Sequence, residues 1–261
     1  MNPTSKLSTA ELAAFEAYTD SFQLALRAQS LSKAKYDSSA NDIVRDALFV
    51  LSHDAICIHQ AIGQLVFTGW SSPASPLVRT LLDLSVSLLA ILNGVSPPLS
   101  AFKYLYANFR RLSRDAHYPA ANKERIRKQV RERIALLPAN QRSDAVRAYG
   151  EKDRAYWFSP EWQSPSAVIE EFGVPGMADF YRQFSAAAHG GLFGLRLFRD
   201  DPDKIDINPR RPPGKHALAV VYISSKLLTE ITRGRNEYES LGIASECSKL
   251  LRAINASALA A

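Results

Sequence analysis

Apolar residues in this chain recur at three- and four-residue steps, while runs of alternating apolar and polar residues are nearly absent. Because an α-helix has about 3.6 residues per turn, this spacing gathers apolar side chains on one helical face. A half-buried strand would instead require a period of two. We therefore expect an all-α protein built as a multi-helix bundle. The longest example comprises Val44, Leu48, Leu51, Ala55, Ile58 and Ile62.

Capping residues and prolines mark the ends of the expected helices. Ser8 and Glu11 have the spacing of a capping box, in which each side chain binds the other residue's free backbone N–H. Pro76 and Pro97 each follow a serine, as expected for the first position of a helix. Together these signals predict helices over residues 8–29, 42–67, 77–93, 97–116, 120–137, 140–152, 176–189, 215–233 and 236–256.

The chain has the length and composition of one large soluble domain. It contains 261 residues and 46% hydrophobic residues, which is enough to bury a core. No internal repeat or break in composition divides it. We expect an N-terminal helical arm over residues 1–34 and one helical domain over residues 35–261. Within that domain, residues 156–175 are expected to be irregular with one short helix, and residues 200–214 to form a loop.

Cysteine usage and hydropathy predict a cytoplasmic protein. Cys57 and Cys247 lie far apart in apolar, helical segments, as expected of free thiols in a reducing compartment. The first residues lack the basic and apolar regions of a secretory signal. The best membrane candidate, residues 77–92, is short for a bilayer and contains Arg79 and Asp83. We interpret it as a buried helix, and expect no membrane partner.

Positive charge is concentrated in the middle of the chain. The net charge is +6, and residues 103–154 alone contain 14 Lys or Arg against 6 Asp or Glu. A focused basic surface attracts polyanions such as RNA or DNA. The same composition also fits helices whose charges serve only to keep the protein soluble. The sequence leaves both interpretations open.

Several chemistries are disfavoured by missing motifs. His53 and His59 stand six positions apart, on different faces of a helix, and no acidic residue or cysteine completes a zinc ligand set. The sequence has no phosphate-binding glycine loop and no Gly-x-Ser-x-Gly elbow. We therefore expect neither a metal nor a cofactor, and the missing motifs argue against the common nucleotide, serine and cysteine hydrolases.

The candidate site lies in the segment Tyr-Arg-Gln-Phe-Ser-Ala-Ala-Ala-His at 181–189. Arg182 and His189 are seven residues apart, so in a helix they fall within about 20° of one face and about 10 Å apart along the axis. Ser185 lies between them, and Tyr181 and Gln183 flank the arginine. We take the arginine and histidine as the central pair of the site and the other three as supporting residues.

This pair suits phosphate chemistry. Arg182 can hold a phosphate through two parallel hydrogen bonds, and His189 can exchange a proton near neutral pH. A structural alternative remains open. A histidine at a helix C-terminus interacts favourably with the helix dipole, and the arginine can pair with Asp179, Asp83 or Glu171.

A second charged pair lies on an otherwise apolar helix. Arg79 and Asp83 are four residues apart, so both side chains occupy one helical face. Burying either charge alone would be costly. We expect them to pair with each other or to reach the helix of the candidate site. If they face His189, Asp83 can orient its imidazole ring.

The Arg-x6-His arrangement resembles the signature of the HEPN superfamily. Leu-Val-Arg-Thr-Leu-Leu-Asp at 77–83, followed by Tyr-Arg-x-x-Ser-x-x-x-His, also resembles an uncharacterised bacterial helical family grouped near it. Catalytic HEPN members carry Asn, Asp or His where this chain has Gln183. The resemblance implies an all-helical homodimer that binds RNA or a nucleotide. It implies either a metal-independent endoribonuclease of a stress, toxin–antitoxin or phage-defence system, with Arg182 and His189 catalytic, or a non-catalytic scaffold that binds a nucleotide or protein.

Overall fold

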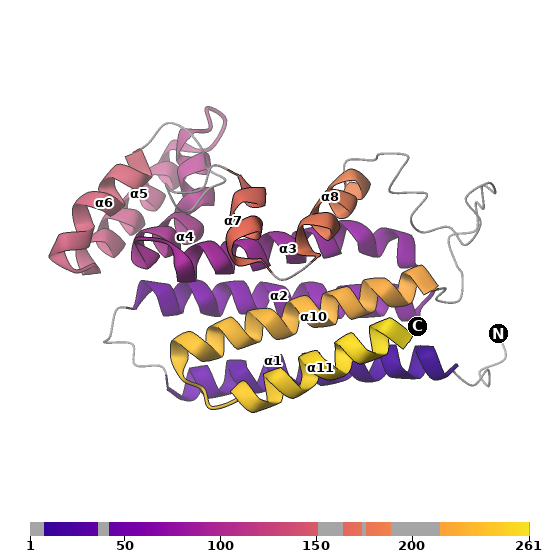
Figure 1. Ribbon diagram of the computed structural model, residues 1–261. Coiled ribbons are helices and arrows are strands. Elements are labelled where there is room, and N and C mark those ends of the chain that lie inside the picture. Colours follow the sequence, from indigo (N-terminus) through magenta and orange to yellow (C-terminus); the bar gives the residue numbers. More distant parts are fainter. Residues whose placement is uncertain (1–7, 36–41, 151–163, 174–175, 189–214, 261) are drawn as a thin grey trace. The chain divides into compact units, whose positions relative to one another are not determined.

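A computed structural model describes residues 8–35, 42–150, 164–173, 176–188 and 215–260 (Figure 1). Every regular element within these ranges is a helix, which confirms the all-α expectation. The sequence predicted the existence of each helix, and the structure corrects several of its boundaries. The helices are α1 (Thr9–Ala34), α2 (Ile43–Phe67), α3 (Ser71–Asn93), α4 (Pro97–Arg114), α5 (Ala120–Leu136), α6 (Ala139–Gly150), α7 (Pro165–Phe172), α8 (Met177–Ala188), α10 (Lys215–Glu239) and α11 (Ala244–Ala260).

The chain divides into two compact units. The first contains residues 1–35, 51–85 and 174–261, and the second contains residues 36–50 and 86–173. Helices α2 and α3 each contribute residues to both units. The candidate site segment belongs to the first unit, whereas the most basic helices belong to the second.

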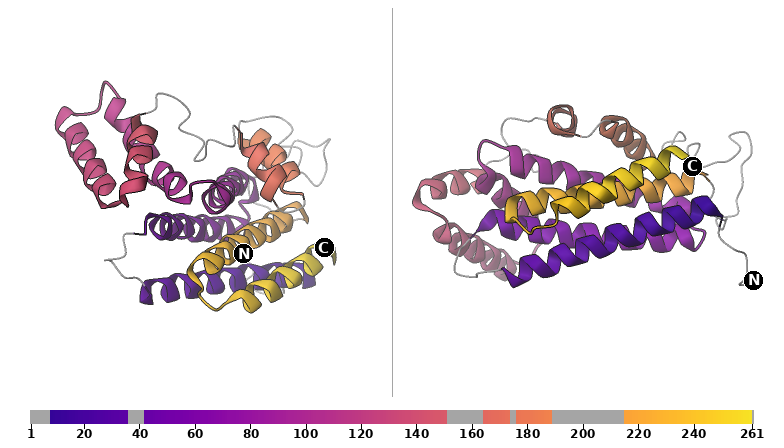
Figure 2. Two further views of the ribbon diagram at one scale, coloured as in Figure 1. Left: turned by 60° about the vertical axis from the view of Figure 1, so that its left-hand side comes forward. Right: turned by 60° about the horizontal axis from the view of Figure 1, so that its bottom comes forward.

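In the first unit, α1, α10 and α11 lie side by side (Figures 1 and 2). The C-terminal ends of α1 and α10 lie together, since the Lys35 ammonium donates to the Ser240 carbonyl at 2.7 Å. Helix α11 then runs back along both. The buried face of α1 is lined mainly by small side chains. Because small side chains allow a shorter distance between helix axes than large ones, α10 and α11 can pack closely on α1. These small side chains are Ala14, Ala17, Ser21, Ala25, Ala28 and Ser32.

The start of α1 confirms the predicted capping box. The Ser8 backbone N–H donates to Glu11 Oε2 at 2.7 Å, and the Glu11 N–H donates to Ser8 Oγ at 3.2 Å. The helix continues to Ala34, five residues beyond the predicted end. Burial explains the extension, because Ser32 is buried and Leu31 packs on the hydrophobic cluster at this end of the first unit.

Helices α1 and α2 are joined by a buried histidine. His59 Nε2 lies 3.1 Å from Ser21 Oγ and 3.3 Å from the Tyr18 carbonyl oxygen. The Tyr18 ring stacks on the imidazole with 4.7 Å between ring centroids. Gly63 leaves room for this ring, because a Cβ there would lie 2.2 Å from Tyr18 Cε2.

The predicted break near residue 234 is wrong, because α10 continues to Glu239. Arg235 and Glu239 form a buried ion pair of 2.6 Å one turn apart, and Arg235 also donates to Gln29 of α1. These contacts hold the last turn of α10 against α1. The chain reverses only beyond Ser240, where Gly242 adopts φ 80° and Asn236 Oδ1 accepts the Ile243 N–H at 3.0 Å.

Helix α3 begins at Ser71, six residues before the predicted start at Leu77. Pro76 therefore lies inside the helix instead of at its first position. A proline there removes one backbone hydrogen bond, while its fixed φ remains compatible with a helical turn. Within the described residues, α3 is the one helix long and apolar enough to cross a membrane, over Ala74–Asn93, a criterion that the core helix of a soluble protein also meets.

In the second unit, α4, α5 and α6 pack on one another. Helix α5 buries Ile126 and Val130, and Leu137 is buried directly after it. Short helix α7 is capped by Ser164, whose hydroxyl accepts the Ala167 N–H at 3.2 Å. Two sequence expectations, the loop over residues 200–214 and the aromatic part of residues 156–163, lie outside the described residues.

Candidate functional site

Arg79 is a largely buried cation on an apolar helix. Val78 and Leu82, which lie beside it on α3, are fully buried, and its own side chain is only 15% exposed. One turn further along α3, Asp83 forms an ion pair with the Arg79 Nη1 group. The expected pairing of these two residues is therefore confirmed. The aspartate is more open to solvent, with 38% of its side chain exposed.

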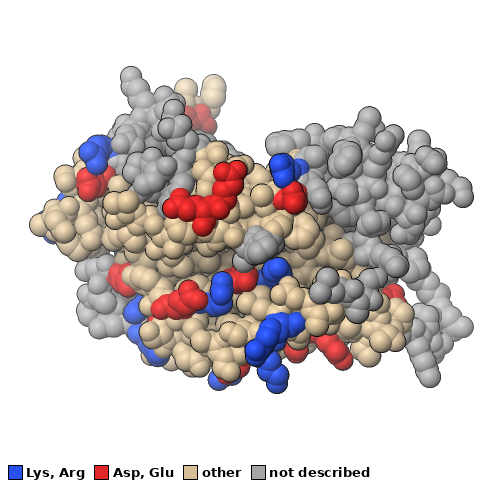
Figure 3. All heavy atoms as spheres, viewed as in Figure 1, with Lys and Arg blue, Asp and Glu red and all other residues tan. Residues whose placement is uncertain are grey.

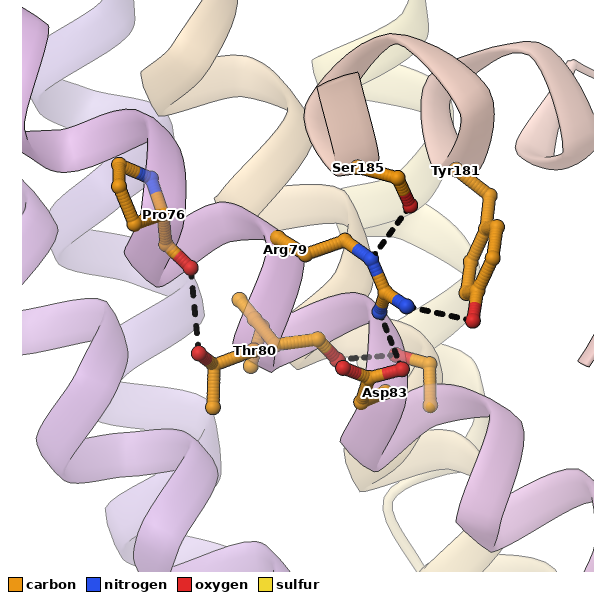
Figure 4. A network of polar contacts seen from close by, with 8 residues as sticks. Pro76, Arg79, Thr80, Asp83, Tyr181 and Ser185 are labelled. Atoms are coloured by element: carbon orange, nitrogen blue, oxygen red, sulfur yellow. Dashed lines mark hydrogen bonds and ion pairs between the residues drawn. The ribbon is translucent and has the colours of Figure 1, made fainter. Parts of the chain in front are cut away.

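The same guanidinium also reaches α8. Arg79 Nε donates to Ser185 Oγ at 2.7 Å, and Arg79 Nη2 donates to the Tyr181 hydroxyl at 2.5 Å (Figure 4). The Arg79 Cζ atom also lies 3.8 Å from the centroid of the Tyr181 ring. Both expected outcomes for Arg79 and Asp83 thus occur together: an ion pair within α3 and contacts with the candidate site segment.

Helix α8 has an apolar face beside these polar contacts. It starts at Met177 after Gly176, whose φ of 82° suits glycine. Met177 and Phe184 are buried. Tyr181 and Ser185 are one turn apart, so both can meet a single partner on α3. The helix is therefore anchored by two apolar side chains and by Arg79.

Three kinds of interaction stabilise the charge of the largely buried Arg79 guanidinium: an ion pair, hydrogen bonds and a cation–π interaction. A guanidinium removed from water needs an opposite charge or hydrogen-bond acceptors around it. Here Asp83 supplies the charge, while Ser185 and Tyr181 supply hydroxyl acceptors. The face of the Tyr181 ring adds a cation–π interaction. The arrangement holds α8 to α3 at one defined position.

Arg182 points to a different side of α8. Its side chain is 75% exposed and its Nη2 lies 2.5 Å from Asp179 Oδ1, one turn earlier on the same helix. Such an exposed pair contributes little to stability and is easily exchanged for another anion. Of the three carboxylates that the sequence offered as ion-pair partners of Arg182, Asp179 is the one with which it pairs. The arginine is available to a ligand in solution.

The structure brings four of the predicted site residues together and leaves Arg182 apart from them. Arg79, Asp83, Tyr181 and Ser185 form one network, whereas Arg182 faces solvent. The Gln183 side chain and all of His189 lie outside the described residues. Helix α8 is described as far as Ala188, and His189 is the next residue in the sequence.

Among the described residues, the other histidines and cysteines do not form a metal site. Within the described ranges, no three His, Cys, Asp or Glu side chains are placed to hold a metal ion. His59 is buried and His53 is exposed, which confirms that they occupy different faces of α2. Burial lowers the pKa of His59 from 6.5 to about 4, so this imidazole is neutral at pH 7. It functions as a packing and hydrogen-bonding element.

The chain was also compared with known proteins. Residues 45–205 match a family described as a family of unknown function, DUF5677. This chain belongs to the DUF5677 family. The region shared with other DUF5677 proteins contains Arg79, Asp83 and the whole of α8. No curated protein and no solved structure matches the chain, so the DUF5677 assignment brings no activity with it.

Sequence reasoning missed two buried polar clusters of this DUF5677 protein. One joins His59 to Ser21 and Tyr18, and the other joins Arg235 to Glu239 and Gln29. Both connect residues that lie far apart in the sequence. The four-residue spacing of the arginine and glutamate was a visible signal, whereas nothing in the sequence indicated partners on α1.

Proposed function

We propose that this protein is a HEPN-like, metal-independent endoribonuclease in which Arg182 binds the phosphate and His189 transfers the proton. Cleavage of RNA by its own 2′-hydroxyl requires removal of that proton, protonation of the leaving 5′-oxygen and stabilisation of the charge on the phosphate. An arginine and a histidine supply these functions without a metal. The similarity of the motif to the HEPN signature supports the proposal.

The observation that carries this proposal is the division of α8 into an anchored side and an open side. Tyr181 and Ser185 are held by Arg79, while Arg182 is exposed and pairs, among the described residues, with Asp179. A phosphate can displace an exposed carboxylate at little cost. Arg79 and Asp83 are then positioning residues, since they hold the helix that carries the reacting groups.

In this proposal the protein is a cytoplasmic homodimer that brings two copies of the motif to one RNA, as part of a stress, toxin–antitoxin or phage-defence system. A pair of identical motifs would supply two arginines and two histidines, which is a fuller set for acid–base catalysis than one chain offers. The exposed thiol of Cys57 and the absence of a disulfide at both cysteines are compatible with a reducing compartment.

The test is an RNA cleavage assay in EDTA with three proteins. Wild type should release fragments ending in 2′,3′-cyclic phosphate. His189→Ala should lose cleavage by roughly 100-fold or more, as expected for loss of a general acid or base. Arg182→Gln should lose it by a similar factor, because the charge on the phosphate is then unbalanced. Asp179→Asn is the matched control, since it releases Arg182 and should leave cleavage intact or increase it.

Two results would overturn the enzymatic proposal. One is the absence of cleavage by wild type across a range of pH and RNA substrates. The other is cleavage that persists unchanged in His189→Ala, which would identify a contaminating nuclease. Circular dichroism of each variant separates a lost reaction from a lost fold.

One observation favours a second candidate, a non-catalytic scaffold that binds a nucleotide or a protein. Each nitrogen of the Arg79 guanidinium already has a partner within the chain. Nη1 pairs with Asp83, Nε donates to Ser185 and Nη2 donates to Tyr181. A residue bound in this way stabilises helix packing and needs no substrate. For the scaffold, His189→Ala would weaken ligand binding or folding, with no cleavage in any sample.

A further inference from the structure

Helices α5 and α6 of the second unit carry most of the net positive charge of the described residues. Residues 120–150 contain eight Lys or Arg and three Asp or Glu. Six of the eight are arginines, the side chain best suited to bind phosphate through paired hydrogen bonds. All but one of the eight are exposed. The exposed ones are Arg125, Arg127, Lys128, Arg131, Arg133, Arg142 and Arg147.

The positions of the buried residues of α5 show which side of this helix faces solvent. Ile126 and Val130 are its fully buried residues, and they point to one side of the helix. At about 100° per residue, Lys128 lies opposite them, with Arg125 and Arg131 about 60° to either side. These three side chains cover about 9 Å of the helix axis and face solvent. We call them the α5 basic face.

The carboxylates near this face do not neutralise it. Glu124 lies 2.6 Å from Arg131 and 3.7 Å from Arg127, and Glu132 lies 3.9 Å from Lys128. All these side chains are at least half exposed, so the ion pairs are weak and exchangeable. Arg125 has no carboxylate partner among the described residues. Two acidic residues thus face four basic ones, and the arginines can turn to an external anion.

The first unit provides a contrast. On the face shown in Figure 3, basic and acidic side chains are interspersed over α10 and α11, without a large region of one sign. Exposed Lys33, Lys249 and Arg252 of this unit belong to helices that also carry exposed or half-exposed acidic residues. Among the described residues, the excess of positive charge therefore lies mainly in the second unit.

We propose that the α5 basic face, extended by the exposed arginines of α6, binds the phosphate backbone of RNA. Phosphates repeat along a nucleic acid strand at intervals that a row of exposed arginines can follow, and binding releases condensed counterions. An amphipathic membrane helix would expose an apolar face beside its charges, but Ile126 and Val130 are buried within the second unit. A soluble polyanion is the partner that this surface fits.

The proposal depends on the proposed function only in naming RNA as the polyanion. It extends that function by separating capture of the RNA by α5 from its cleavage by the α8 motif. Binding can therefore be measured on RNA that cannot be cut. A 2′-O-methyl RNA has no 2′-hydroxyl nucleophile, so failure of cleavage and failure of binding give different results.

The experiment is fluorescence anisotropy of the full chain with a labelled 2′-O-methyl RNA of about 20 nucleotides, from about 0.05 to 0.2 M salt. Replacing Arg125, Lys128 and Arg131 with Gln should weaken binding roughly tenfold or more at low salt and reduce the slope of log K against log salt by about 2. Glu124→Gln with Glu132→Gln should tighten binding. The matched control replaces Lys33, Lys249 and Arg252 with Gln, which removes the same charge from the first unit and should change Kd less than threefold or so.

Three results would overturn the proposal: no binding by wild type at low salt, equal weakening by the α5 variant and its control, or unchanged affinity in the α5 variant. Two further probes identify the partner. Single-stranded DNA of the same length should bind with the same dependence on α5, since the phosphate chemistry is shared. Preferential binding to phosphatidylserine vesicles over RNA would assign this face to a membrane surface and contradict the proposal.

Discussion

The Arg79 guanidinium and the Tyr181 ring are bound in two ways: Arg79 Cζ lies 3.8 Å from the ring centroid, and Arg79 Nη2 donates to the Tyr181 hydroxyl. These contacts can be removed one at a time. Tyr181→Phe keeps the ring and should cost about 1 kcal/mol of unfolding free energy through the lost hydrogen bond. Tyr181→Leu should cost about a further 1 kcal/mol through the lost cation–π interaction.

Urea unfolding of the full chain measures both effects. In an Arg79→Met background the difference between Phe and Leu at position 181 should nearly vanish, because the cation is gone. Arg182→Met is the matched control, since this arginine is exposed on the same helix. It should change stability by less than about 0.5 kcal/mol. A loss at Arg182 as large as that at Arg79 would contradict the assignment of anchored and open sides.

Acid should destabilise the first unit through His59. Its pKa is about 4 in the fold and 6.5 for the unfolded chain, so the unfolded state takes up the proton first as pH falls. Stability is therefore retained above pH 6.5 and is lost progressively between 6.5 and 4, by up to about 3 kcal/mol. Chemical denaturation at a series of pH values measures this loss.

The exposed His53 supplies the control for this acid effect. His59→Gln should flatten the dependence of stability on pH within that window, whereas His53→Gln should leave the wild-type slope. Carboxylates that titrate in the same range affect all three proteins equally. Identical slopes in the two variants would show that the buried imidazole is not the group responsible.

Gly63 should tolerate no side chain while Tyr18 is present. A Cβ at this position would lie 2.2 Å from Tyr18 Cε2. The ring cannot move aside without losing its contacts with His59 and Phe67. We expect Gly63→Ala to lower the unfolding free energy by about 1–3 kcal/mol. In a Tyr18→Ala background the same change should be neutral or stabilising, because alanine favours helix over glycine; an equal cost in both backgrounds would disprove the clash.

The two cysteines should differ in reactivity. Cys57 is exposed, whereas Cys247 is buried and burial raises the pKa of its thiol to about 11. Because the thiolate is the reactive form, a disulfide reagent at pH 8 should modify one thiol per chain rapidly and the second only after denaturation. Cys57→Ser should abolish the rapid phase. Two equally rapid thiols would contradict the packing of α11.

Features that depend on nearby residues could be predicted from the sequence, whereas features that depend on distant residues could not. The capping box at Ser8 and the apolar spacing of α2 depend on neighbours within a few residues, and both were predicted from the sequence. The extension of α10 to Glu239 depends on Gln29, which is 206 positions from Arg235. No local pattern carries that information, so the predicted break near residue 234 failed.

The candidate site also combines a contact within one helix, which was predicted, with contacts between helices, which were not. Four-residue spacing predicted the ion pair of Arg79 with Asp83, because both ends lie on one helix. The hydrogen bonds from Arg79 to Tyr181 and Ser185 span more than 100 residues, and only the packing of α8 on α3 determines them. Three carboxylates were expected as possible partners of Arg182, and only the structure selects Asp179, one turn earlier on α8.

The central proposal is that His189 and Arg182 together carry out metal-independent cleavage of RNA. The most direct measurement is the single-turnover rate of cleavage of one labelled RNA in EDTA, by wild type and by His189→Ala at equal, saturating concentrations. We predict a rate ratio of about 100 or more, with 2′,3′-cyclic phosphate ends in the wild-type products. Equal rates for two folded proteins would contradict the account.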